Sequence, residues 1–135
     1  MLYDAIIMSQ TVISVVDDMF FASKIRAVAG AASVEISFPR SQEAVVSKAR
    51  ETKPGLIVVD LHNQRIDPVA LARELKADEE LRGIKLLGFF SHVQTELQRN
   101  AVAAGFDRVI PRSVFARDLA EILTTGYTDT GAITS

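Results

Sequence analysis

The fold of this chain is decided by VISVVDD (residues 12–18) and LIVVD (residues 56–60). Each is a short β-branched run that ends on an acid and is followed by sequence with a helical period, which is typical of a buried parallel strand. In open α/β sheets the carboxyl ends of the strands meet at one edge, where ligands bind. Because Asp17 and Asp18 follow one strand and Asp60 ends another, the sequence predicts a pocket for a divalent cation at that edge.

Composition limits the classes of protein that the chain can belong to. Its 135 residues, 48% hydrophobic and 24% charged, predict one globular domain with a sizeable core. A net charge of −2 without a basic cluster argues against a nucleic-acid surface. The chain has no cysteine, which excludes disulfides, thiolate zinc sites and thiol catalysis. Its apolar runs are too short to cross a membrane, and residues 1–10 lack the features of a signal peptide, so we expect a cytoplasmic protein without membrane contact.

Apolar runs alternate with helix-period segments along the chain. This alternation implies βαβ crossovers and a mainly parallel sheet over residues 11–124. Residues 1–10 are expected to form an N-terminal extension, and the polar residues 125–135 a flexible tail. The expected strands are 12–16, 33–37, 55–60, 84–90 and 107–111, and the expected helices are 18–29, 41–52, 67–79, 94–104 and 114–124.

Local signals predict where these helices begin and end. Ser41 is a plausible N-cap for the second helix, and Ser113 for the last. The third helix opens on an N-cap acid, Asp67, with Pro68 at the first helical position. Gly105 suits a left-handed turn at the end of the fourth helix.

The order of these features resembles the receiver domain of two-component response regulators. The match runs over residues 11–124 and includes Asp17-Asp18 after the first strand and Asp60 after the third. Ser91 stands at the hydroxyl position that receivers have after the fourth strand. Residues 104–113 correspond to the family pattern Ala-Gly-x(6)-Lys-Pro, with Arg112 in place of the lysine. The resemblance implies a doubly wound five-stranded parallel sheet of order 2-1-3-4-5 with helices on both faces.

The resemblance also implies a chemistry for these residues. Asp60 would be the nucleophile that accepts a phosphoryl group as an acyl phosphate. Ser91 would donate a hydrogen bond to that group, and Arg112 would pair with another of its oxygens.

A magnesium ion is the cofactor that the resemblance implies. Asp17 and Asp18 would hold Mg²⁺ directly or through water, and Asp60 and the backbone carbonyl near His62 would complete the oxygen shell. The cation would relieve repulsion among the carboxylates and neutralise charge on the phosphoryl oxygens.

The chain departs from the family pattern at three positions. Arg112 keeps the positive charge of the lysine as a planar fork, which allows it to bind a phosphoryl group or to form a standing ion pair with Asp60. Ser113 replaces the proline whose preceding peptide bond is usually cis, so a trans bond is expected here. Val109 stands where many receivers place the aromatic that rotates on activation.

Several of these residues also have simpler interpretations. Asp17 and Asp18, each taken alone, are explained as an N-cap and a first-turn acid of the following helix. His62 and His92 flank the expected pocket, but they are also ordinary loop residues. Phe20 either covers an edge of the core or helps to dock a phosphodonor domain, as that part of the first helix does in receivers.

Two functional hypotheses follow. The first is a stand-alone receiver that is phosphorylated on Asp60 by a histidine kinase or phosphotransfer domain and binds an unknown downstream protein. It would not be an enzyme beyond self-phosphorylation from small donors and self-dephosphorylation. The alternative is a pseudo-receiver, an interaction module that Arg112 fixes in one conformation and that is never phosphorylated.

Two other flavodoxin-like families fit the sequence less well. Asp60-Leu61-His62 is similar to the Asp-x-His of cobalamin-binding domains, but that family continues x-x-Gly where this chain has Arg65. Flavodoxin itself would need a phosphate loop rich in Ser, Thr and Gly after the first strand, where this chain has acids.

Overall fold

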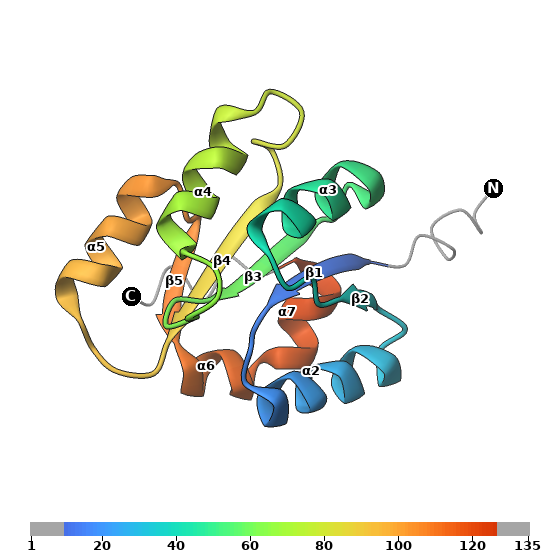
Figure 1. Ribbon diagram of the computed structural model, residues 1–135. Helices are drawn as coiled ribbons and strands as arrows, with labels where there is room; N and C mark the ends of the chain where they lie inside the picture. The colour runs from blue at the N-terminus through green and yellow to red at the C-terminus, as the bar shows by residue number, and fades with distance from the viewer. Residues whose placement is uncertain (1–9, 127–135) are drawn as a thin grey trace.

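The computed structural model describes residues 10–126, and these form a five-stranded sheet of order β2-β1-β3-β4-β5 with every pair parallel (Figure 1). The sequence predicted this fold class and this order. Residues 1–9 and 127–135, which include most of the expected extension and tail, lie outside the described range. The strands are β1 Thr11–Val15, β2 Glu35–Ser37, β3 Leu56–Asp60, β4 Lys85–Phe90 and β5 Arg108–Pro111.

Helices cover both faces of the sheet, and each face has its own hydrophobic core. One core lies under α3, α4 and α5, and the other lies under α2, α6 and α7 (Figure 1). None of the helices within residues 10–126 has the length and apolar character needed to cross a membrane. The helices are α2 Met19–Ala31, α3 Gln42–Thr52, α4 Pro68–Ala77, α5 Thr95–Ala104, α6 Arg112–Arg117 and α7 Leu119–Thr125.

The central strand β3 shows why the acids gather at one edge. All five of its residues are buried, and they alternate between the two cores: Ile57 and Val59 face one, and Leu56 and Val58 face the other. Full burial of such side chains stabilises a fold by about 1.5–3 kcal/mol each. The strand is therefore held firmly, and its last residue, Asp60, is delivered to the carboxyl edge.

Most predicted helix ends are confirmed. The Ser41 hydroxyl accepts a hydrogen bond from the Ala44 N–H (3.0 Å) and caps α3. Asp67 caps α4, and Pro68 is the first helical residue. Gly105 ends α5 with φ +122°, a conformation in which a Cβ atom would lie only 2.5 Å from the Lys76 side chain.

The end of the chain differs from the prediction of one helix over 114–124. Two short helices, α6 and α7, meet at Asp118. The predicted Ser113 cap is wrong, because Pro111 (ψ 148°) already supplies the extended residue before the helix and α6 begins at Arg112. The bond before Ser113 is trans as expected, since no cis peptide occurs in the described part of the chain.

Two other elements begin later than expected. The second strand covers only Glu35–Ser37, because Ser33 (φ 59°) still belongs to the turn after α2. The first helix starts at Met19, since Asp18 is its N-cap and keeps an extended backbone.

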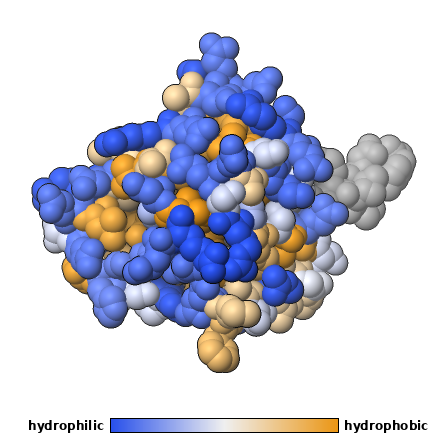
Figure 2. Space-filling view, viewed as in Figure 1, coloured by the Kyte–Doolittle hydropathy of each residue, from blue (hydrophilic) through white to orange (hydrophobic). Residues whose placement is uncertain are grey.

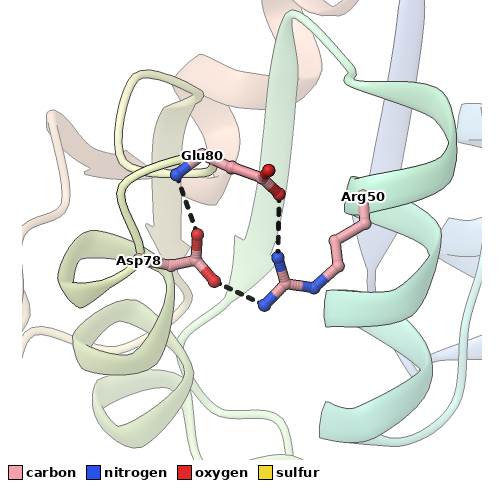
Figure 3. Close-up of polar contacts among 3 residues, drawn as sticks. All are labelled: Arg50, Asp78 and Glu80. Carbon is pink, nitrogen blue, oxygen red and sulfur yellow. Dashed lines mark hydrogen bonds and ion pairs between the residues drawn. The ribbon is translucent and has the colours of Figure 1, made fainter.

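A side-chain network ties α3 to the turn after α4 (Figure 3). Arg50 reaches across from α3, pairing with Asp78 and, at 3.1 Å, with Glu80. Asp78 in turn accepts a hydrogen bond from the Glu80 N–H (2.8 Å), which is the main reason that the pKa of Asp78 is lowered. The network is solvent-exposed. It links α3 to the end of α4 on the face of the sheet opposite to α2.

Candidate functional site

The structure brings the three predicted acids to the carboxyl edge of β1 and β3. The two strands pair in register up to Val15 and Val59, so the residues that follow them are neighbours. The loop after β3 reaches back to the loop after β1, where the Gln64 N–H donates to Asp17 Oδ2 (3.3 Å). The negative charge of Asp17 contributes to raising the pKa of Asp60, as expected for two acids that share an edge.

Asp60 is the buried acid of the site, with only 6% of its surface exposed. Burial is the main cause of its raised pKa, against which a hydrogen bond from the His62 backbone N–H to Oδ1 (2.9 Å) acts. Its other oxygen, Oδ2, has no hydrogen-bond partner among residues 10–126 and is not sealed from solvent. The residue therefore presents one anchored oxygen and one open oxygen.

Both carboxylate oxygens of Asp18 have partners in the fold. Oδ1 accepts from the N–H groups of Phe20 (3.0 Å) and Phe21 (3.1 Å), which makes Asp18 the N-cap of α2. Oδ2 forms an ion pair with Arg112 Nη2 at 3.2 Å. The pKa of Asp18 is lowered, mainly by the hydrogen bond from the Phe21 N–H; desolvation opposes this, and the hydrogen bond and charge of Arg112 lower the pKa further. The simpler interpretation, an N-cap at Asp17 followed by a first-turn acid at Asp18, is wrong by one residue, because the cap is Asp18 and α2 has no acid in its first turn.

Arg112 lies at the site, but its partner is not the predicted one. A standing ion pair with Asp60 was one expectation, and the structure contradicts it, because the guanidinium group pairs with Asp18. The helix α6 begins at Arg112 and directs the side chain over the first turn of α2, where the guanidinium lies 4.1 Å from the centre of the Phe21 ring. Its charge still lowers the pKa of Asp60, although this is the smallest of the effects on that group.

Phe21 belongs to a cluster of three buried aromatic rings. The sequence did not indicate that this cluster is part of the site. The Phe89 and Phe115 rings stack with their centres 4.7 Å apart, and Phe21 meets both edge-on at 5.5 and 5.8 Å. The cluster joins α2, β4 and α6. The Phe21 ring, which Arg112 contacts, is therefore part of the core. The helical period placed Phe21 inward, but nothing in the sequence paired it with an arginine 91 positions later.

The loop after β4 carries Ser91 and His92. Ser91 is exposed at the end of the strand, and its side chain has no hydrogen bond within the described residues. The His92 N–H donates to His62 Nε2 at 3.5 Å, and the two imidazole rings lie 5.8 Å apart. The two histidines therefore connect the loops after β3 and β4 beside Asp60.

Asn63 is a second residue that the sequence did not single out. Its Oδ1 accepts from the N–H groups of Arg65 (2.8 Å) and Ile66 (2.9 Å), and its Nδ2 donates to the Val15 carbonyl (3.3 Å). The first two bonds form an Asx turn. An asparagine three residues after a strand is typical of such a turn, so the turn could have been predicted from the sequence. The third bond fixes the β3 loop against the end of β1.

Comparisons with curated proteins give partial matches to response regulators. The chain is 31% identical over 88 residues to the response regulator protein VraR of Staphylococcus saprophyticus, a match covering 65% of this chain and 41% of that protein. It is 33% identical over 81 residues to VraR of Staphylococcus aureus, covering 60% and 38%. The chain thus spans about two fifths of the length of these relatives. No family model matches the chain.

Solved structures match over most of the chain. A putative response regulator from Chloroflexus aurantiacus superposes with a TM-score of 0.74 at 17% identity, covering 84% of this chain and 93% of that one. The receiver domain of sensor histidine kinase PA1611 from Pseudomonas aeruginosa gives 0.74 at 18% identity, covering 85% and 94%. This chain has the receiver-domain fold. The resemblance to receivers of response regulators is thereby confirmed.

The acids at this edge of the sheet fit a divalent cation in chemistry but not in their present arrangement. Carboxylate oxygens are suitable ligands, and the Pseudomonas aeruginosa receiver is described with a magnesium ion in its active-site cleft. Within residues 10–126, however, no group of three or more acidic or histidine side chains is placed to hold a metal. Asp60 Oδ2 is open, whereas Asp18 Oδ2 faces Arg112. Asp18 fits as a ligand only when it leaves that ion pair.

Beside the acids, the protein has a cavity of about 120 Å³ between the first turns of α2 and the loops after β2 and β3. Its wall includes Asp17, Met19 and three arginines, one of which, Arg26, lies 4.5 Å from the Phe38 ring centre. Strongly hydrophilic side chains gather on this face in Figure 2, and apolar atoms project where α2 begins. Phe20, next to the cavity, is 91% exposed, so it does not cover the core.

Proposed function

We propose that this receiver domain accepts a phosphoryl group on Asp60 and signals through contacts with other proteins. The placement of Asp60 carries the proposal: it is buried at the carboxyl end of the central strand, with Oδ1 held by the His62 N–H and Oδ2 open. Burial raises the pKa of this acid, which makes the carboxylate more basic and a better nucleophile.

The proposed reaction is the displacement of a leaving group at phosphorus. Asp60 Oδ2 forms a new P–O bond as the bond from phosphorus to the leaving group breaks. The leaving group departs with that electron pair as an imidazole when the donor is a phosphohistidine, or as acetate when it is acetyl phosphate. The His62 N–H keeps Oδ1 fixed during the transfer and so orients the attacking oxygen.

A magnesium ion is the proposed cofactor. The residues that would hold it are Asp17, Asp18 and Asp60, together with the backbone carbonyl of His62. When bound, it would neutralise charge on the transferring phosphoryl oxygens.

Ser91 and Arg112 have proposed roles around the phosphoryl group. Ser91 is exposed at the end of β4, and its hydroxyl is available to donate a hydrogen bond. The bond from the His92 N–H to His62 ties the loop that carries Ser91 to the loop beside Asp60. Arg112 holds Asp18 at rest, and its guanidinium is the donor that could turn to a phosphoryl oxygen.

The proposed partners are a histidine kinase or phosphotransfer domain and a downstream protein, in the cytoplasm, with no nucleic acid. Met19 and Phe20 support a docking surface beside the site, because they are 78% and 91% exposed at the start of α2. Large apolar side chains with that exposure are typical of protein contacts.

The pseudo-receiver is not favoured. That hypothesis drew on the departures at Arg112, Ser113 and Val109, with Arg112 fixing one conformation, and a standing pair of Arg112 with Asp60 was one form of it; Arg112 pairs with Asp18 instead. Asp60 thus keeps an open oxygen.

Intact-protein mass spectrometry after incubation with acetyl phosphate and Mg²⁺ tests the proposal. We expect one added phosphoryl group on the parent and on Asp67→Asn, a control in which asparagine can still cap α4. We expect none on Asp60→Asn. Phosphorylation of Asp60→Asn, or none of the parent, would contradict the proposal.

A further inference from the structure

We propose that Arg112 and a divalent cation compete for Asp18, so that their ion pair limits the affinity of the acidic edge for Mg²⁺. The inference rests on the proposed function, because it concerns the same acids. The proposed function does not require this competition. In the competition, the receiver carries an internal cation, the Arg112 guanidinium, which must leave Asp18 before the metal is fully bound.

Arg112 is held in place by two different contacts. Nη2 of the guanidinium lies 3.2 Å from Asp18 Oδ2, and the central carbon of the group lies over the Phe21 ring, 4.1 Å from its centre. A planar cation can use both at once, whereas a lysine ammonium offers no flat face. The Phe21 ring is itself fixed by Phe89 and Phe115, so the seat exists before the arginine occupies it.

Asp18 has only one oxygen that it can give to a cation without disturbing the fold. Oδ1 caps α2 by accepting from two backbone N–H groups, and removing it would leave those donors without a partner. Oδ2 is the oxygen that Arg112 occupies. A divalent cation at Oδ2 would lie beside the guanidinium, and two positive groups at that distance repel each other.

The arrangement of the acids agrees with this competition. Asp17 and Asp60 follow or end two strands that pair in register, yet no three-ligand group is formed in residues 10–126. The third acid is present in the sequence and close in space, but it is turned to Arg112. Releasing the arginine would complete the set and free the guanidinium for an oxygen of the phosphoryl group. Metal binding and the repositioning of Arg112 are thus one event.

A titration with MgCl₂ followed by ¹H–¹⁵N NMR measures the competition directly. We compare the parent with Arg112→Gln, which removes the charge, and with Arg117→Gln as a control. Arg117 lies on the same helix, is 70% exposed and pairs with Asp118, away from the acids. We expect the Kd for Mg²⁺ to fall about tenfold in Arg112→Gln, which corresponds to about 1.4 kcal/mol. We expect the Kd of the control to match that of the parent.

The parent itself should report the exchange of partners. The Arg112 Nε–H resonance should move with the same midpoint as the amide signals of Asp17 and Asp60. If Arg112→Gln does not fold, Phe21→Leu serves instead, because it removes the ring face and should lower the Kd for Mg²⁺ in the same direction. An affinity for Mg²⁺ that is equal or weaker without Arg112, or an Arg112 signal unmoved at saturation, would overturn the inference.

This experiment separates the inference from the proposed function. Phosphorylation of Asp60 without any gain in Mg²⁺ affinity in Arg112→Gln would overturn the competition and leave the phosphoacceptor in place. Tighter Mg²⁺ binding in Arg112→Gln without phosphorylation of Asp60 would support the competition and contradict the phosphoacceptor.

Discussion

At the scale of single residues, Asp18 and Asp60 show how neighbours give two aspartates opposite properties. The pKa of Asp18 is lowered by the backbone N–H groups that it caps and by Arg112, so it stays ionised as a structural acid. The pKa of Asp60 is raised, mainly because it is buried. Asp18 stabilises the fold in its charged form. Burial disfavours the charged form of Asp60, which is typical of acids at functional sites.

The raised pKa of Asp60 predicts a pH-dependent gain in stability when the charge is removed. The folded state holds the proton of Asp60 more tightly than the unfolded state, so ionisation destabilises the fold as pH rises through both pKa values. Asp60→Asn, which can still accept from the His62 N–H, should therefore raise the free energy of unfolding at pH 7 by on the order of 1 kcal/mol.

Urea unfolding at several pH values checks this prediction. The advantage of Asp60→Asn should shrink as pH falls through the raised pKa of Asp60, because protonation removes the buried charge from the parent. A variant that is less stable than the parent at pH 7, or an advantage that grows in acid, would show that the Asp60 carboxylate does not strain the fold.

At the scale of elements, the site depends on how closely β4 and the loop after β3 pack. Gly88 of β4 pairs with Val59, and a Cβ atom there would lie 2.9 Å from Leu61 Cδ2 and 3.1 Å from Phe106 Cδ2. Both neighbours are buried, at 3% and 4% exposure, so neither has room to move. Because Leu61 directly follows Asp60, the spacing of these elements sets the position of the Asp60 carboxylate.

Gly88→Ala should consequently destabilise the protein by about 1–3 kcal/mol, as overpacking of a tight core does. The matched control is Gly83→Ala, since nothing lies within 4 Å of a Cβ atom built at Gly83. Thermal unfolding of the two variants gives the comparison. Equal melting temperatures would mean that the contact between β4 and Leu61 is looser than described.

At the scale of the whole molecule, the sheet and the gathering of the acids were predictable from the sequence, whereas their partners were not. Strand burial and the β/α alternation determine which residues reach the carboxyl edge, and both can be read from local patterns. The Arg112–Asp18 pair depends on where α6 starts and on a ring supplied by α2. Such contacts join distant segments, and no local pattern encodes them.

The most direct test of phosphoryl acceptance at Asp60 is a crystal structure of the protein with Mg²⁺ and beryllium trifluoride, which imitates a phosphoryl group bound to a carboxylate. We expect beryllium bonded to Asp60 Oδ2, Mg²⁺ beside it on Asp17 and Asp18, and the Arg112 guanidinium removed from Asp18. An Asp60 without the fluoride group at saturating concentrations, or the group on another carboxylate, would contradict this expectation.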